Sequence, residues 1–442
     1  MKRFLLFSSL GLLIVLLAAC GGGEAEAPAE ESLLPTPIEQ VQPTAEPTLP
    51  PPVVSADGEA VSGGETAPEV QPEQPVAEAE PLGPVVPWPV EAFGYGAKIH
   101  GNASVGNAAD TMDSMRHQLD LDWVKMQLKW PVVHPGVDAD QWFFYDSVIE
   151  EANKNGVNLM VSVVGAPKWT RGQGNEHGPP DDYAHFVAFL DELLTRHPGR
   201  IQAIEVWNEQ NLDREWASPN GISPEDYVEF LRQSYETIKR HDPNIIVISG
   251  ALSPTGPGDW VGWADDFEYM DRALAAGMLD YADCVGAHHN GYNIPPDVTA
   301  EDAPSHPKSQ TAVFRGPFDN PHHSWSFKTT IDTYAQKVQA VDPSKKLCVT
   351  EFGWATVEGY DTFPPGFEFA QDNSLQEQSD YIVQAFQQMH DSGDVWLAFL
   401  FNYDFGNKGG GPTDDPVPYS ILDTNGIPRP AFGAVSAMEK TP

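Results

Sequence analysis

The chain has 442 residues, of which 64 are Asp or Glu and 25 are Lys or Arg, so that its formal net charge is −39. Binding to nucleic acid depends on patches of Lys and Arg that neutralise phosphates, and this balance argues against a nucleic acid partner. Hydrophobic residues make up 41% of the chain and aromatic residues 10%, which is enough for the sizeable core of one large domain.

The first 20 residues have the pattern of an export signal. Lys2 and Arg3 supply the initial positive charge, residues 4–17 form an apolar run, and small residues precede Cys20. The run is too short to span a bilayer well. The stretch Leu17-Ala18-Ala19-Cys20 resembles a bacterial lipobox, whose cysteine is lipidated and becomes the mature N-terminus. The resemblance implies an extracytoplasmic protein, attached to the membrane of the cell envelope only through Cys20; the alternative is an ordinary secretory signal with a chance cysteine.

Residues 21–91 form the next segment, which is rich in Pro, Glu and Ala. It has no Lys or Arg, because none occurs between Arg3 and Lys98. Such a composition cannot bury a core, and its charges repel one another, which predicts a disordered spacer. We therefore expect a tether that holds a folded domain, residues 92–442, away from the membrane.

From residue 93 onward, apolar runs alternate with amphipathic segments of helical length. The eight candidate strands are residues 93–100, 123–130, 158–165, 201–208, 245–250, 284–289, 346–352 and 395–403. The candidate helices are residues 109–119, 145–155, 182–196, 224–240, 263–276, 329–341, 375–392 and 430–438. Eight alternating units predict parallel pairing and a closed (β/α)₈ TIM barrel, an α/β fold. No Gly-rich phosphate-binding motif follows the first strand, which argues against a dinucleotide-binding fold.

The longest connections follow the C-terminal ends of the last four candidate strands. They are residues 254–262, 290–328, 355–374 and 406–420. Catalytic groups collect at this end of a barrel, so the extra length lies where a substrate groove would be shaped.

Two acidic motifs stand at strand ends. The fourth candidate strand ends in Trp207-Asn208-Glu209, and the seventh ends in Glu351-Phe352-Gly353-Trp354. Cleavage of a glycosidic bond uses two carboxyl groups, one protonated to assist the leaving oxygen and one ionised. The alternative is a pair of ion-paired carboxylates at the barrel rim without a catalytic role.

These motifs resemble the clan A glycoside hydrolases, which carry an Asn-Glu pair at the end of strand four and a Glu at the end of strand seven. The resemblance covers residues 93–438 and is most like family 5 and family 39. It implies a retaining hydrolase of a β-linked oligo- or polysaccharide, without cofactor or metal. Glu209 would be the general acid/base, Glu351 the nucleophile, and Asn208 a partner of the sugar 2-hydroxyl.

The sixth candidate strand ends in His288-His289-Asn290-Gly291-Tyr292. Many clan A enzymes have a His and a Tyr here, the Tyr contacting the nucleophile, so we expect His288 and Tyr292 to bind substrate or support the site. His288 matches the clan's His position, but the residue two places on is Asn290, and the nearest Tyr is Tyr292. The identity of the nucleophile's partner is therefore open.

Basic and aromatic side chains at other strand ends complete the candidate site. Lys98 and His100 alternate to one side of the first strand, and Lys125 and Lys129 lie on the second, where some clan members have an Arg. Either pair binds substrate hydroxyls or forms ion pairs. Aromatic rings bind the C–H face of a sugar, although each could equally pack between loops. The aromatic candidates are Trp130, Trp169, Trp207, Trp354, Phe401 and Tyr403.

Cys284 and Cys348 are the remaining cysteines after Cys20, and they lie in apolar runs. Two buried free thiols are the favoured interpretation, with a single bridge as the alternative. Two further functions are compatible with the same barrel: a non-catalytic carbohydrate-binding surface lipoprotein and a transglycosylase. Exo-acting and endo-acting enzymes would share both carboxylates, and the sequence gives no indication of the oligomeric state.

Overall fold

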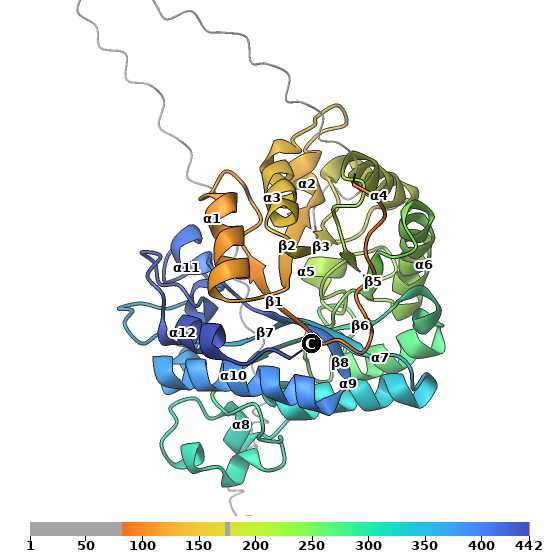
Figure 1. The fold of residues 1–442 in the computed structure, drawn as a ribbon. Coiled ribbons are helices and arrows are strands. Elements are labelled where there is room, and N and C mark those ends of the chain that lie inside the picture. The colour runs from red at the N-terminus through yellow and green to blue at the C-terminus, as the bar shows by residue number, and fades with distance from the viewer. Residues whose placement is uncertain (1–81, 173–176, 442) are drawn as a thin grey trace, which may run out of the picture. The chain divides into compact units, whose positions relative to one another are not determined.

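The computed structural model describes residues 82–172 and 177–441, so the predicted signal, Cys20 and most of the predicted spacer lie outside the described residues. Eight parallel strands form a barrel surrounded by helices (Figure 1). The strands are β1 (Gly94–Ile99), β2 (Trp123–Lys129), β3 (Asn158–Val164), β4 (Ala203–Val206), β5 (Ile246–Ser249), β6 (Val285–Gly291), β7 (Leu347–Trp354) and β8 (Val395–Leu400). The predicted (β/α)₈ TIM barrel is confirmed.

The sheet runs in the order β5-β4-β3-β2-β1-β8-β7-β6, so that β1 pairs with β8 as it does with β2. Two isolated parallel bridges, Ile248 with Cys284 and Leu252 with Ala287, join β5 to β6 and close the circle. All strands therefore point the same way, and their C-terminal ends meet at one mouth.

The outer layer consists of helices whose apolar faces pack on the strands. Its main members are α1 (Ala108–Asp113), α3 (Phe143–Lys154), α4 (Ala184–Arg196), α6 (Pro224–His241), α7 (Asp266–Ala275), α9 (Phe327–Val341), α10 (Leu375–Ser392) and α12 (Pro430–Ala437). Four shorter helices lie in the connections: α2 (Trp130–Val133), α5 (Asp213–Trp216), α8 (Gly316–Asp319) and α11 (Phe405–Lys408).

Local sequence fixes where the long helices start and stop. α10 begins with a capping box, in which the Ser374 side chain accepts from the Glu377 backbone and Glu377 accepts in return from the Ser374 backbone. It ends at Gly393, whose φ of +71° suits glycine. None of the helices in the described part of the chain has both the length and the apolar character needed to cross a membrane.

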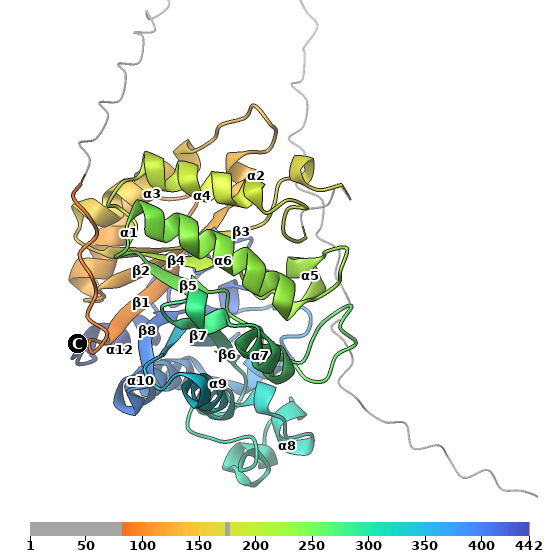
Figure 2. The same ribbon diagram turned by 90° about the vertical axis from the view of Figure 1, so that its right-hand side faces the viewer.

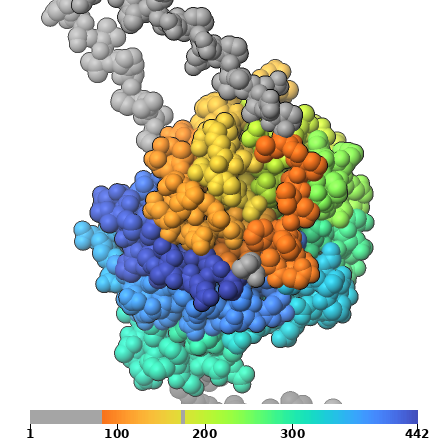
Figure 3. Space-filling view, viewed as in Figure 1, coloured from red at the N-terminus to blue at the C-terminus, as the bar shows by residue number. Residues whose placement is uncertain are grey.

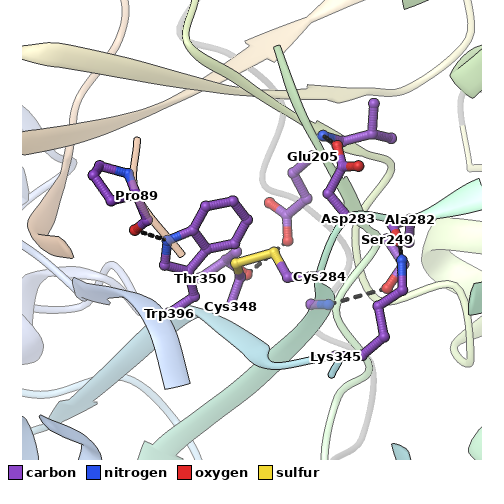
Figure 4. Close-up of a disulfide and its surroundings, with 12 residues drawn as sticks. Pro89, Glu205, Ser249, Ala282, Asp283, Cys284, Lys345, Cys348, Thr350 and Trp396 are labelled. Atoms are coloured by element: carbon purple, nitrogen blue, oxygen red, sulfur yellow. Dashed lines mark hydrogen bonds between the residues drawn. A yellow bond between two sulfur atoms is a disulfide. The ribbon is translucent and has the colours of Figure 1, made fainter. Parts of the chain in front are cut away.

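The lower half of the barrel interior is apolar and contains a disulfide. Cys284 and Cys348 are bonded, with their Cα atoms 5.8 Å apart, so the interpretation of two free thiols is wrong. They are 64 residues apart in sequence, but β6 and β7 are neighbours and bring them together. Figure 4 shows the bridge beside Trp396, with Glu205 and Thr350 nearby.

The first described residues lie across the N-terminal end of the barrel (Figure 3). The backbone N–H of Val85 donates to Asp242 at 2.6 Å, and the Pro89 carbonyl accepts from the Trp396 indole at 2.9 Å. Trp88 packs edge-on against Trp123, with ring centroids 5.6 Å apart. Residues 82–91 fall within the predicted spacer, yet here they cover the N-terminal end of the barrel, opposite the mouth.

Candidate active site

Glu209 stands just beyond β4 on a backbone that is unusual for non-glycine residues. Trp207 has a φ of +77° and Glu209 a φ of +44°, conformations that cost about 1–3 kcal/mol each. Surrounding contacts hold the turn: the Trp207 indole donates to the Glu215 carbonyl at 2.8 Å, and the Glu209 N–H donates to the Ala251 carbonyl at 2.9 Å. The turn fixes the Glu209 carboxyl group at the mouth.

Glu351 reaches the barrel interior because β7 is irregular. The β6–β7 register shifts between Ala287 and His288, and the β7–β8 register shifts between Val349 and Phe352. Neighbouring strand residues normally point to opposite faces. Here both Thr350 and Glu351 make contacts inside the barrel, Thr350 by donating to Glu205 at 2.6 Å.

A buried lysine–glutamate network, made of Lys98, Lys125, Glu205 and Glu351, lies beneath the mouth. The Lys98 ammonium is 2.6 Å from the Glu351 carboxylate and also donates to Gln127 at 3.1 Å. The Lys125 ammonium is 3.3 Å from Glu351 and 2.9 Å from Glu205. Lys98 and Lys125 thus form ion pairs with the candidate nucleophile, whereas Lys129 is exposed.

The network keeps Glu351 ionised. Burial by itself would raise the pKa of Glu351, but Lys98, Lys125 and His288 outweigh it and hold that pKa well below its usual range. Burial likewise opposes the charge of Glu205, whose pKa is nevertheless lowered by Lys125. The fully buried ammonium of Lys125, on β2, thus lies between two carboxylates.

His288 joins the two candidate catalytic acids into one site. Its Nδ1 atom is 3.3 Å from Glu209 and its Nε2 atom is 3.9 Å from Glu351. The imidazole is almost fully buried at the end of β6. The carboxylates of Glu209 and Glu351 thus lie at the two nitrogen atoms of a single ring.

Tyr292 is not the partner of Glu351 in this structure. Its ring packs against Phe314, Trp325 and Phe369, in the loop region above β6 and β7. Burial, together with the charge of Glu209, raises the pKa of Tyr292 to about 12. The Tyr292 hydroxyl therefore stays protonated, and the group that contacts Glu351 is Lys98 instead.

Glu209 is ionised for a different reason. Burial would raise its pKa, but the hydrogen bond with His288 and the charge of Arg214 lower the pKa to about 2. The Arg214 guanidinium is 3.0 Å from Glu209, and 64% of the Arg214 side chain is exposed. The pKa of Glu209 thus depends partly on Arg214, an exposed side chain that can move, whereas the pKa of Glu351 depends on buried lysines that cannot move.

We expect Arg214→Ala to raise the pKa of Glu209 from about 2 toward the ordinary value of a glutamate, because an attractive positive charge is removed. The carboxyl carbon of Glu209, followed by ¹³C NMR against pH, reports this directly. Arg232→Ala is the matched control, since Arg232 pairs with Glu229 and Glu236 on the outer helix α6. An unmoved Glu209 titration in Arg214→Ala would show that His288 alone sets it.

The remaining candidates are divided between mouth and core. Asn208 is buried beside Glu209, and within the described residues its side chain has no hydrogen bond to protein. His100 is half-buried, with its ring 5.0 Å from that of Phe405. Trp169 is 37% exposed on the turn after β3. The Phe401 ring lies 4.9 Å from the Lys98 ammonium. Of these four, Trp169 is exposed, His100 is half-buried, and Asn208 and Phe401 are buried.

Trp354 is a correction to the predicted site. It is fully buried, donates its indole N–H to the Ile294 carbonyl at 2.9 Å, and packs against Phe327 of α9 and Tyr381 of α10. It therefore points outward from β7 into the helix layer. The ring stabilises the barrel wall and cannot stack on a sugar at the mouth.

Several groups of the site were not predicted. Glu205 and Gln127 lie inside strands, where an alternating pattern marks an inward position but not its partner. Arg214 and Glu215 follow Glu209 by five and six residues, and this closeness in sequence was the available signal. In the parts of the chain that the structure describes, no three or more His, Cys, Asp or Glu side chains are grouped to hold a metal ion.

Comparisons with known proteins support the architecture. No protein-family model matches the sequence, and no curated protein matches it. Solved structures do match. One is a family 39 glycoside hydrolase from Bacteroides cellulosilyticus WH2, with TM-score 0.52 and 18% identity, and the match covers 79% of this chain and 64% of that chain. A glucosidase from Croceicoccus marinus matches with TM-score 0.53 and 14% identity over 81% of this chain and 66% of that one. Xylanase 10B from Thermotoga maritima matches with TM-score 0.52 and 14% identity, over 79% of this chain and 95% of that one.

The chain thus spans slightly less than two thirds of the first two structures and nearly all of the third. At 14–18% identity these likenesses concern the fold, which is the same eight-stranded barrel. The site is therefore described by its own geometry: two carboxylates at one mouth, one buried against lysines and one on a loop against arginine.

Proposed function

We propose that this protein is a retaining glycoside hydrolase of the clan A type, which cleaves the O-glycosidic bonds of a β-linked glycan by double displacement. The observation that carries the proposal is the position of His288, 3.3 Å from Glu209 and 3.9 Å from Glu351, between carboxylates from β4 and β7. Glycoside hydrolysis uses such a pair across one sugar-sized opening.

In the first step a carboxylate oxygen of Glu351 bonds to the anomeric carbon while the bond from that carbon to the leaving oxygen breaks. Glu209 gives its proton to the leaving oxygen, and the leaving sugar departs as an alcohol. In the second step Glu209 takes a proton from water, the water oxygen bonds to the anomeric carbon, and the ester bond to Glu351 breaks. Both carboxyl groups return to their starting states.

The lysines support the nucleophile in both steps. Lys98 and Lys125 keep Glu351 ionised before attack and stabilise the carboxylate when it leaves the sugar again. Glu209 needs a proton for the first step, and its low pKa in the free protein comes partly from Arg214. A sugar that enters the mouth and draws the exposed Arg214 away would raise the pKa of Glu209 and let it bind that proton.

The names of the similar structures are in line with this proposal. A family 39 glycoside hydrolase, a glucosidase and a xylanase share the barrel, and each acts on a carbohydrate according to its name. Fold alone does not determine chemistry, so the proposal depends on Glu209, Glu351 and their surroundings.

The test is hydrolysis of a panel of aryl β-glycosides and β-linked glycans, with the first-formed anomer identified by ¹H NMR. A retaining enzyme releases the β-anomer first, before mutarotation. An α-anomer as first product would contradict double displacement. Glycan binding without turnover would identify a carbohydrate-binding lipoprotein instead, and transfer of the sugar to an added acceptor would identify a transglycosylase.

We further propose that the enzyme works outside the cytoplasm, lipid-anchored to the cell envelope through Cys20. The buried Cys284–Cys348 disulfide supports export, because such bonds persist in oxidising compartments. Cys20→Ala should move the protein from the membrane fraction to the soluble fraction of expressing cells and abolish labelling by a clickable palmitate analogue. A Cys20→Ala variant that carries no label but stays in the membrane fraction would contradict the lipid anchor.

A further inference from the structure

Glu215 is a carboxyl group at the mouth that the mechanism above does not use. It lies on α5, the short helix after β4, six residues beyond Glu209. Figure 2 shows α5 at the end of the barrel opposite residues 82–91, among the loops that follow the C-terminal strand ends. The residue is half-buried rather than exposed, unlike Arg214 beside it.

The backbone of α5 is held rigidly from several sides. The Glu215 carbonyl accepts the Trp207 indole N–H at 2.8 Å, and the next residue, Trp216, is fully buried. The Asp213 N–H donates to the Gly262 carbonyl at 3.0 Å, which ties the helix to the loop after β5. The backbone that carries the Glu215 side chain is therefore fixed next to Trp207 and the loop after β5.

The Glu215 carboxyl group has no protein partner. Within the described residues its oxygens make no hydrogen bond and no ion pair, although Arg214 is adjacent and pairs with Glu209 instead. The charges of Glu209, Lys129 and Lys98 all act on it. These three residues stand at the ends of β4, β2 and β1, and the Glu215 carbonyl is bonded to Trp207 beside Glu209, so Glu215 lies close to the strand ends that surround the mouth.

We propose that Glu215 is a third carboxyl group of the active site, which hydrogen-bonds a hydroxyl group of the leaving sugar beside Glu209. The inference rests on the proposed function, because the leaving oxygen must lie at Glu209. Groups beyond Glu209 then meet the departing part of the substrate. A half-buried carboxyl without a protein partner hydrogen-bonds water in the free protein, and a sugar hydroxyl can take the place of that water.

The protonation of Glu215 fits a neutral sugar. Burial and then the negative charge of Glu209 raise the pKa of Glu215 to about 8, against the opposing charges of Arg214, Lys129 and Lys98. At neutral pH the group is mostly a carboxylic acid, which donates one hydrogen bond and accepts others. Glu215 should therefore contribute more to the hydrolysis of substrates whose leaving group is itself a sugar than to that of substrates with a phenol.

The test compares Glu215→Met, which keeps the size but removes hydrogen bonding, with Glu215→Gln, which keeps a donor and an acceptor. The substrates are an aryl β-glycoside and a β-linked disaccharide of the same sugar that the wild type hydrolyses. In Glu215→Met we expect kcat/KM for the disaccharide to fall by about 10- to 100-fold, mainly through KM, and roughly 10-fold more than for the aryl substrate. Glu215→Gln should recover most of the loss.

Glu225→Met is the matched control, because Glu225 pairs with Arg272 on the outer surface, and its kinetics should equal those of the wild type. Equal losses on both substrates in Glu215→Met would show that the residue acts through Glu209 or the fold, and would overturn the inference. A disaccharide rate like that of the wild type would overturn it too. Turnover by the wild type supports the proposed function in either case, whereas a wild type that hydrolyses nothing refutes both.

Discussion

Replacing Glu351 by Ala should lower kcat/KM for an activated aryl β-glycoside by roughly 10⁴- to 10⁶-fold, as expected when a nucleophile is removed. Glu205, the other carboxylate that pairs with Lys125, cannot take its place, since it is fully buried and tied to Lys125 and Thr350. Added azide should restore part of the rate and give an α-glycosyl azide, because a small anion can enter the vacated space. Initial rates with a chromogenic substrate and NMR of the azide product measure both effects.

The control for this experiment must separate chemistry from folding. Loss of the Glu351 carboxylate leaves Lys98 with one fewer partner in a buried site, which costs about 3–5 kcal/mol in comparable ion pairs. Glu351→Gln keeps an acceptor oxygen for Lys98 and should melt closer to the wild type, yet remain inactive. A folded Glu351→Gln variant with a normal rate would end the assignment of the nucleophile.

Glu209→Ala should reduce the rate by about 10²- to 10⁴-fold for substrates with poor leaving groups and much less for activated ones. A good leaving group departs without a proton, whereas a sugar or a weakly acidic phenol needs the one that Glu209 supplies. A series of aryl β-glycosides gives the measurement: log kcat/KM plotted against the pKa of the phenol should become steeper in the variant. A parallel line would mean that Glu209 does not protonate the leaving oxygen.

The fold and the proximity of Glu209 and Glu351 could be predicted because both depend on patterns that are local in sequence. Eight apolar runs separated by amphipathic segments determine a parallel barrel, and parallel strands bring their C-terminal ends to one mouth. Glu209 and Glu351 therefore had to meet once the strands were assigned. Their common contact with His288 is the detail that the structure adds.

The partners of these acids could not be predicted, because each depends on the closed barrel. Ion pairing was one of the two roles expected for Lys98 and Lys125, but the sequence does not indicate that Glu351 and Glu205 are the partners that make their burial acceptable. Trp354 was misassigned because it was judged by its place at a strand end, although its position three residues after Glu351 puts it on the opposite face of β7. Tyr292 was placed near the nucleophile by resemblance, but its ring packs against Trp325 and Phe369.

The pairing of Cys284 with Cys348 was not predicted for a related reason. Their separation of 64 residues gives no indication of contact until β6 and β7 lie side by side.

The disulfide between Cys284 and Cys348 has a consequence for how the protein would resist proteases. The chain from Cys284 to Cys348 is a covalent ring that includes the long connection after β6. A single cut at that connection would open the ring without releasing either half, so a nicked molecule would still migrate as one piece until a reductant is added.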